Sequence, residues 1–299
     1  MPDSMDHRGS RQLLGLAAVT AASMIWGCGF VFQRASMDYI GPYTFSAIRN
    51  IIAWIAIECW VLLKKIPNNI PTKERRKSGF ICGLLAFAGT SFQQVGLVYT
   101  TAGKAGFIGI LYIVIVPLAS ALILRRPVDK KTWLGVFLAC VGFYLLSMSG
   151  ATSLSKGDLY EFIAAFMWAA QILAVEHFAQ DQDPFHLSLA QFKIVAIFSA
   201  LIALVTESLS VPALIQAVPG LLYAGLLSSA LGFPLQILGE KILDPTIAAL
   251  LMSIEGVFSA IVGSIILHES LTGREMLGCG IILLSVALSQ LPWKAKSTS

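Results

Sequence analysis

The chain has few charged residues. Asp, Glu, Lys and Arg make up 13% of its 299 residues, whereas a typical soluble domain has about 25%. Hydrophobic residues make up 56%, and the mean hydropathy is +0.76. This composition excludes an ordinary soluble domain and indicates that lipid surrounds most of the chain. The net charge of +4 is too small and too scattered for a nucleic-acid-binding surface.

Signatures of enzymes and of cofactor sites are also absent. The sequence has no H-E-x-x-H, no G-x-S-x-G, no Walker loop and no paired aspartates within an apolar segment. Its five cysteines lie inside apolar segments without C-x-x-C spacing, so we interpret them as small buried residues. We therefore expect neither an enzyme nor a bound cofactor or metal.

Long apolar runs dominate what is present. The first run follows Arg8 and Arg11 and is longer than a typical signal-peptide core, so we expect a retained helix. Each run is long enough to cross about 30 Å of hydrocarbon as a helix. The expected spans are Leu13–Phe32, Pro42–Leu63, Gly79–Tyr99, Gly103–Leu124, Thr132–Met148, Leu159–Phe178, His186–Val205, Gly220–Leu238, Thr246–Leu267 and Glu275–Leu291.

The two halves of the chain repeat the same pattern. Matching residues stand 142 positions apart: Trp26 and Trp168, Pro42 and Pro184, Arg49 and Gln191. The polar segment Ser149–Gly157 separates them, which predicts repeats at residues 1–150 and 151–299. An odd number of spans in each repeat inverts the second relative to the first, an arrangement typical of carriers with alternating access. The sequence thus predicts an all-α, polytopic membrane protein with ten transmembrane helices in two inverted five-helix repeats.

The distribution of basic residues predicts the orientation. With ten spans, both termini share one face, and 15 of the 21 Lys and Arg residues fall on that face or its loops, against four on the other. The positive-inside rule places the basic face in the cytoplasm. We expect a multi-pass protein of the bacterial inner (plasma) membrane with both termini cytoplasmic.

Two groups of residues carry a family resemblance. The first is I-W-G-C-G-F followed by I-G-P-Y-T-F-S-A-I-R, from Ile25 to Arg49, and the second runs from Ser253 to Thr272 with Leu277 and Gly278 after it. Together they resemble the ten-helix, EamA-type branch of the drug/metabolite transporter superfamily, over roughly residues 13 to 291. The resemblance implies a secondary carrier for amino acids, other metabolites or drugs. Gly256 stands where a proline is usual after Glu255.

Ionisable residues deep in a span are costly and therefore candidates for function. Glu255 is near the middle of the ninth span, where it could couple protons, bind a substrate ammonium group, or form a hydrogen bond between helices as a neutral carboxyl. Arg49 could bind a substrate carboxylate, or anchor two helices. Lys193 lies in the middle of the seventh span, which the family plan places at the periphery, and Glu58 and Glu161 are expected to reach lipid headgroups.

Aromatic and amide side chains form a second group of candidates. Gln33 and Gln171 share helix faces with Trp26 and Trp168. Gln93 near the end of the third span and Tyr112 mid-way along the fourth add polar groups. These side chains could either line a central chamber or bond neighbouring helices. The candidates for substrate binding, with Arg49, are Trp26, Gln33, Gln93, Tyr112, Trp168 and Gln171. As a set they favour a chamber suited to a small zwitterion or an aromatic solute. Small residues four apart, such as Gly79 and Gly83, predict close helix packing.

The sequence therefore predicts a secondary transporter that exports a small polar metabolite, such as an amino acid, by alternating access and with proton coupling. Its partners are the substrate, the lipid bilayer and protons, and no nucleic acid. The alternatives are a carrier for metabolite uptake or exchange, a drug efflux carrier, and a membrane sensor or scaffold without flux.

Overall fold

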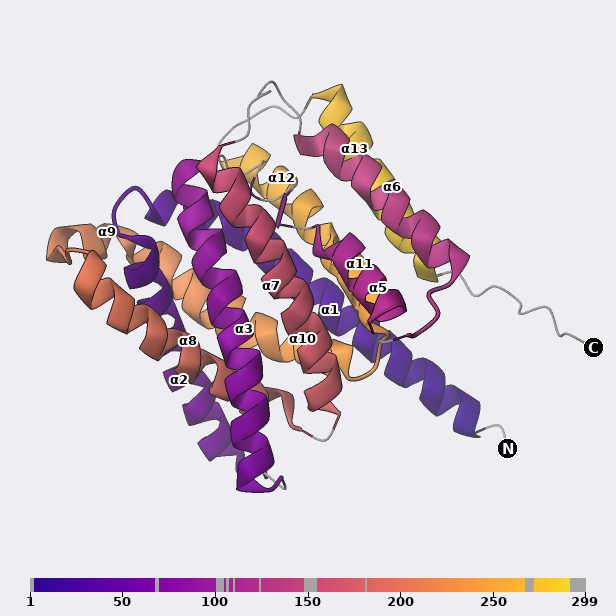
Figure 1. Ribbon diagram of the computed structural model, residues 1–299, viewed down its shortest axis with the longest axis horizontal. Coiled ribbons are helices and arrows are strands. Elements are labelled where there is room, and N and C mark those ends of the chain that lie inside the picture. The colour runs from indigo at the N-terminus through magenta and orange to yellow at the C-terminus, as the bar shows by residue number, and fades with distance from the viewer. Residues whose placement is uncertain are drawn as a thin grey trace, which may run out of the picture.

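The computed structural model describes residues 3–67, 70–100, 105, 108–109, 111–123, 125–147, 155–180, 182–266 and 272–290. Within these ranges the chain is helical, as expected (Figure 1). Most of the separator Ser149–Gly157, the first part of the span Gly103–Leu124 and residues 267–271 of the resemblance lie outside the described residues. The first half contains α1 (Asp3–Ser36), α2 (Pro42–Lys64), α3 (Thr72–Tyr99), α5 (Tyr112–Leu122) and α6 (Lys130–Ser147).

The second half contains more irregular helices. Its elements are α7 (Lys156–Ala179), α8 (Pro184–Thr206), α9 (Val211–Leu222), the π-helix η1 (Tyr223–Gly232), α10 (Phe233–Glu240), α11 (Pro245–Met252), α12 (Ile254–Ile266) and α13 (Gly273–Gln290). The expected eighth span is the continuous run α9–η1–α10. The expected ninth span is interrupted at Ser253, where a tight turn separates α11 from α12.

Local sequence sets where several helices begin. The repeated prolines, Pro42 and Pro184, are the first residues of α2 and α8, a position that needs no backbone N–H donor. Before Pro184, the carboxylate of Asp183 accepts hydrogen bonds from the N–H groups of Phe185 and His186. Asp244 caps α11 in the same way, by accepting from Thr246.

Helices of the first half pack against helices of the second half. α2 packs against its counterpart α8 at the left of the view, and α6 packs against its counterpart α13 at the right (Figure 1). α1 packs against η1 and α10, which form the eighth span. The counterpart of α1 is α7, and it packs against α3, the third span. Each of these contacts therefore has an equivalent contact in which the two halves have exchanged roles. This two-fold exchange agrees with the expected all-α fold of two inverted repeats, over the part of the chain that the structure describes.

The length and apolar composition of the helices indicate that this bundle is a membrane protein. Six described helical segments are long and apolar enough to cross a bilayer: Ser10–Ser36, Pro42–Lys64, Thr72–Tyr99, Lys156–Ala179, Pro184–Thr206 and Val211–Glu240. Shorter apolar helices follow at Tyr112–Leu122, Pro245–Ser259 and Met276–Leu288. Many large apolar side chains, Leu204 and Leu63 among them, are exposed on the outside, as expected where lipid is the solvent.

Candidate functional site

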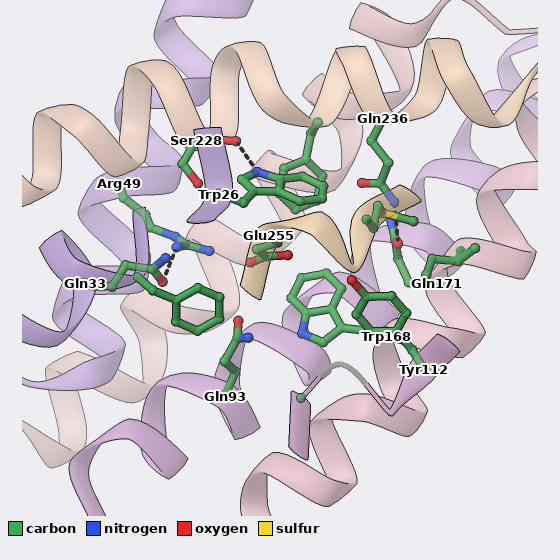
Figure 2. Close-up of a pocket in the computed structure, with 15 residues that line it drawn as sticks. Trp26, Gln33, Arg49, Gln93, Tyr112, Trp168, Gln171, Ser228, Gln236 and Glu255 are labelled. Carbon is green, nitrogen blue, oxygen red and sulfur yellow. Dashed lines mark hydrogen bonds between the residues drawn. The ribbon is translucent and has the colours of Figure 1, made fainter. Parts of the chain in front are cut away.

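A cavity lies in the centre of the bundle, where helices from both halves meet (Figure 2). It offers about 70 Å³ to the centres of water-sized molecules, room for several waters at roughly 10–15 Å³ each. All eight candidates from the sequence line it: Trp26, Gln33, Arg49, Gln93, Tyr112, Trp168, Gln171 and Glu255. Residues that the sequence analysis did not select also line it: Phe30, Gly109, Ile172, Ser228, Phe233, Gln236 and Met252. We call this space the central cavity.

The two repeat-related tryptophans, Trp26 of α1 and Trp168 of α7, line the central cavity, and both pack on the ring of Phe233. Phe233 lies between them, with ring centroids 5.4 Å from Trp26, edge to face, and 6.2 Å from Trp168. Phe192 of α8 packs on the same ring at 5.3 Å. The aromatic wall therefore joins the two repeats and gives the cavity an apolar side.

The indole of Trp26 is fixed by a backbone carbonyl of η1. Its Nε1–H donates to the carbonyl oxygen of Ser228 at 2.8 Å (Figure 2). A π-helix bonds five residues apart and an α-helix four, so the spacing of the backbone hydrogen bonds changes where η1 passes into α10. At this change the N–H of Phe233 donates to the carbonyl of Ser229, and the carbonyl of Ser228 accepts from the indole. Pro234, in the first turn of α10, has no N–H to donate and favours this irregularity.

Arg49 brings a positive charge into the same cavity. It lies in the second turn of α2 and is buried, and its Nη1 donates to the amide oxygen of Gln33 at 3.0 Å. Its guanidinium carbon stands 5.9 Å from the ring centre of Phe45. Its Nε–H has no hydrogen-bond partner among the described residues. A buried guanidinium with unused donors can bind a carboxylate through two parallel hydrogen bonds.

Glu255 brings a carboxyl group into the cavity from the opposite side. It lies in the first turn of α12, directly after the interruption at Ser253, and its carboxyl is near the middle of the cavity between Arg49 and Trp168 (Figure 2). A helix N-terminus within the membrane favours negative charge, whether on the protein or on a ligand. Glu255 is buried, and it forms no ion pair with any described residue, including Arg49.

The backbone around Glu255 is held close to α1. A β-carbon built on Gly27 would lie 2.5 Å from the carbonyl oxygen of Glu255 and 2.6 Å from Cβ of Phe258. Only glycine therefore fits at this crossing of α1 and α12 without moving one of the helices. Gly27 follows Trp26, so the same turn of α1 positions the indole and the helix that carries the carboxyl.

Amide side chains form a hydrogen-bonded chain along the other wall. Gln171 Nε2 donates to Gln191 Oε1 at 3.0 Å, and Gln236 Nε2 donates both to Gln171 Oε1 at 3.3 Å and to Glu240 Oε1 at 2.7 Å. Gln191 is the repeat counterpart of Arg49. In each half, therefore, the residue seven positions after the helix-starting proline bonds a glutamine of the preceding helix. Tyr112 and Gln93 complete the lining from α5 and α3.

Other ionisable residues from the sequence lie outside the central cavity. Lys193 does not line it and forms an ion pair with Glu58 at 3.1 Å, with the ring of Trp54 5.0 Å away. The expectation that Glu161 reaches lipid headgroups is wrong: its side chain is fully buried, because α3 and α7 pack closely there, against Gly96. The described part of the chain contains no group of three or more His, Cys, Asp or Glu that could hold a metal ion.

The sequence signals missed part of the site for identifiable reasons. Ser228 contributes a main-chain oxygen, which side-chain patterns do not indicate. Gln236 and Glu240 stand four residues apart in the eighth span, a spacing that places them on one helix face and could have identified them.

Chemically, the central cavity combines three elements. It has a cation at Arg49 and a carboxyl at Glu255, neither in an ion pair with any residue that the structure describes, and it has aromatic and amide side chains. Such a site can bind a small molecule of mixed polarity. It has no arrangement of nucleophile and base for covalent chemistry among the residues that line it.

Comparison with known proteins agrees with this architecture. The model of the EamA-like transporter family matches the chain twice, at residues 13–148 and 155–291. An uncharacterized transporter from Archaeoglobus fulgidus is 32% identical over 278 residues, which cover 93% of this chain and 85% of that protein. The uncharacterized transporter YoaV from Bacillus subtilis is 25% identical over 292 residues, covering 93% and 98%.

A solved crystal structure has a similar fold. It superposes with a TM-score of 0.75 over 94% of this chain and 96% of its own, at 18% sequence identity. This likeness shows the fold, and the two family matches in tandem and the relative above 30% identity show the class of the protein. The chain belongs to the EamA-like transporter family and is a multi-pass membrane transporter, not an enzyme.

Proposed function

We propose that this transporter exports a small zwitterionic metabolite, such as an amino acid, in exchange for protons. The observation that carries the proposal is the pair of opposite charges in one cavity: Arg49 and Glu255 line the same space without pairing with each other. Both termini are cytoplasmic in this proposal, as the basic residues predict, and the membrane is the bacterial plasma membrane.

The zwitterion fits because it satisfies both charges at once. A buried, unpaired ion costs several kcal/mol, and a partner of opposite sign removes most of that cost. The guanidinium of Arg49 binds the substrate carboxylate, while Gln33 holds the guanidinium in place through Oε1. Glu255 binds the ammonium group, and Trp26 and Trp168 contact the side chain of the substrate. Gln93, Tyr112 and Gln171 bind its polar atoms.

Exchange for protons follows from the position of Glu255. A carboxyl buried within the membrane is stable when it is protonated or when a cation is bound to it. A proton and the substrate ammonium therefore compete for the same group. A carrier that changes its accessible face only with one of them bound moves substrate outward as protons move inward.

The conformational change in this proposal is a rocking of residues 1–150 against 151–299. The central cavity lies at the interface of these halves, with Trp26 and Arg49 from the first and Trp168 and Glu255 from the second. Phe233, between the two tryptophans, contacts both halves and can change its packing as the cavity opens to either face.

Efflux of cationic drugs is the second candidate function. The three rings of Trp26, Trp168 and Phe233 favour a flat cationic compound, since a cation binds well over an aromatic face. The positive charge of such a compound would interact with the carboxylate of Glu255, and the compound has no carboxylate for Arg49 to bind. Arg49→Gln therefore separates the two functions: it impairs transport of amino acids and leaves transport of cationic drugs unchanged.

Counterflow in proteoliposomes tests the proposal. Purified protein is assayed with a panel of amino acids and cationic drugs, with and without an imposed pH gradient. We expect a subset of amino acids to exchange, and an inside-acid or inside-alkaline gradient to drive net movement in opposite directions. Glu255→Gln abolishes the response to the gradient, whereas Glu74→Gln, at an exposed site at the start of α3, preserves it. Unchanged coupling in Glu255→Gln excludes Glu255 as the proton site.

A further inference from the structure

A second hollow lies on the outside of the bundle, between α3 and α8. It offers about 550 Å³ to the centres of water-sized molecules, much more than the central cavity. None of its lining residues lines the central cavity. They are Arg75, Arg76, Gly79 and Phe80 from α3, and His186, Leu189, Ala190, Lys193 and Ile194 from α8. We call it the α3–α8 groove.

The lining residues form two facing stripes. On α3, Arg76 and Phe80 are four residues apart, and on α8, His186, Ala190 and Ile194 follow one another at the same spacing. Residues four apart lie on one face of a helix, so each stripe follows one helix face. The floor is a close contact between the helices, because a β-carbon built on Gly79 would lie 2.6 Å from Cβ of Ala190. The small residues expected from the sequence to bring helices together thus create the groove.

The groove has a basic end and an apolar length. Arg75 and Arg76 stand at its rim, and neither forms an ion pair with any residue in the described ranges. His186 lies beside them, with Nε2 3.1 Å from the carbonyl oxygen of Ile66. No carboxylate is among the lining residues. Further along, Phe80, Leu189 and Ile194 provide apolar surface, and Phe80 is half exposed.

Lys193 lies near the inner end of the groove. Its ion pair with Glu58 compensates its charge, so the uncompensated charge is at the rim. Lys193 stands nine residues after Pro184, the start of α8, which at 1.5 Å per residue is a depth of about 13 Å. Both walls belong to helices that are long and apolar enough to span a bilayer. A groove that begins at their ends and continues to this depth is accessible to a lipid tail.

We propose that the α3–α8 groove binds one anionic phospholipid. The phosphate of the lipid is held by the guanidinium groups of Arg75 and Arg76, whose planar donors match phosphate oxygens. One acyl chain lies along Phe80, Leu189 and Ile194. A basic pocket between transmembrane helices is the expected chemistry for an anionic headgroup. The lipid lies against α3, which also contributes Gln93 to the central cavity, and against α8, whose Phe192 packs on the cavity residue Phe233.

Native mass spectrometry of the detergent-purified protein tests this proposal. Phosphatidylglycerol is titrated against wild type and against the double variant Arg75→Gln/Arg76→Gln. At about 1 kcal/mol per basic residue, loss of both lowers the affinity roughly 30-fold. The matched control is Lys73→Gln/Lys77→Gln, which removes the same charge from the same exposed turns of α3 outside the groove and lowers it less than threefold.

The outcomes separate a lipid from other ligands. Phosphatidylcholine binds at least tenfold more weakly to wild type, and excess glycerol 3-phosphate does not displace phosphatidylglycerol, because it lacks the acyl chain. Equal weakening in both double variants overturns the proposal, since it indicates only general surface charge. Displacement by glycerol 3-phosphate, or equal binding of phosphatidylcholine, overturns it as well. These measurements do not depend on transport, so they are independent of the proposed export function.

Discussion

The two repeat-related tryptophans have the same ring and different hydrogen bonds, so the same substitution at each should have different effects. Trp26 Nε1–H donates to the carbonyl oxygen of Ser228 at 2.8 Å. The indole N–H of Trp168 has no acceptor among the described residues and faces the central cavity (Figure 2). Trp26→Phe therefore removes a structural hydrogen bond, and Trp168→Phe removes a donor that is available to the substrate.

The size of the difference follows from the carbonyl that is left behind. Trp26→Phe removes the indole donor of the Ser228 carbonyl, and a buried acceptor that loses a hydrogen-bond partner costs about 1–3 kcal/mol. Both substitutions remove the same ring volume next to Phe233, so that loss nearly cancels between them. We expect Trp26→Phe to be less stable than Trp168→Phe by about 1–3 kcal/mol. Trp168→Phe should instead weaken substrate binding, by up to about tenfold for one neutral hydrogen bond.

The free energy of unfolding of each variant can be measured by titration with sodium dodecyl sulfate in mixed micelles. Substrate affinity can be measured on the same preparations by competition in proteoliposomes. Equal loss of stability in the two variants would refute the assignment of the Ser228 carbonyl as the partner that fixes Trp26. A loss of affinity in Trp26→Phe alone would refute the assignment of Trp168 as the substrate-facing donor.

Two further predictions concern stability. Gly27→Ala places a β-carbon 2.5 Å from the carbonyl oxygen of Glu255 and should lower the free energy of unfolding by about 1–3 kcal/mol. The control Gly280→Ala, whose β-carbon has nothing within 4 Å, should not lower it. Unfolding titrations of both variants measure the difference. Asp129 caps α6 by accepting from the N–H of Thr132 at 2.6 Å, so Asp129→Ala should lose about 1 kcal/mol at neutral pH. Hydrogen bonds from the side chain and backbone of Thr132 hold the pKa of Asp129 below its ordinary value. The stabilisation is therefore complete above the ordinary pKa and disappears as the pH falls through the lowered one, where variant and wild type should converge.

Much of the fold could be predicted because hydropathy and proline positions act locally. Pro42 and Pro184 begin the helices where the repeat places them, and the apolar runs correspond to helices in the described ranges. The interruption at Ser253 and the π-helix before Phe233 could not be predicted in this way. Both depend on which backbone groups find partners on other helices, such as the indole of Trp26.

The candidate site could be predicted where a polar or charged residue lies deep within an expected span. Arg49 and Glu255 are conspicuous because charge is rare at that depth. Glu161 was placed wrongly because its position near a helix end suggests headgroups, whereas packing of α7 against Gly96 of α3 buries it. The pairing of Lys193 with Glu58 also required the structure, since 135 residues separate them.

The most direct test of the central claim is equilibrium binding of an amino acid that is transported, compared with its decarboxylated amine and its deaminated acid. Wild type should bind the zwitterion more tightly than either analogue. Arg49→Gln should lose that preference over the amine, and Glu255→Gln should lose it over the acid. If both variants keep the wild-type preference for the zwitterion over both analogues, the opposite charges of the central cavity do not recognise the substrate, and the account is contradicted.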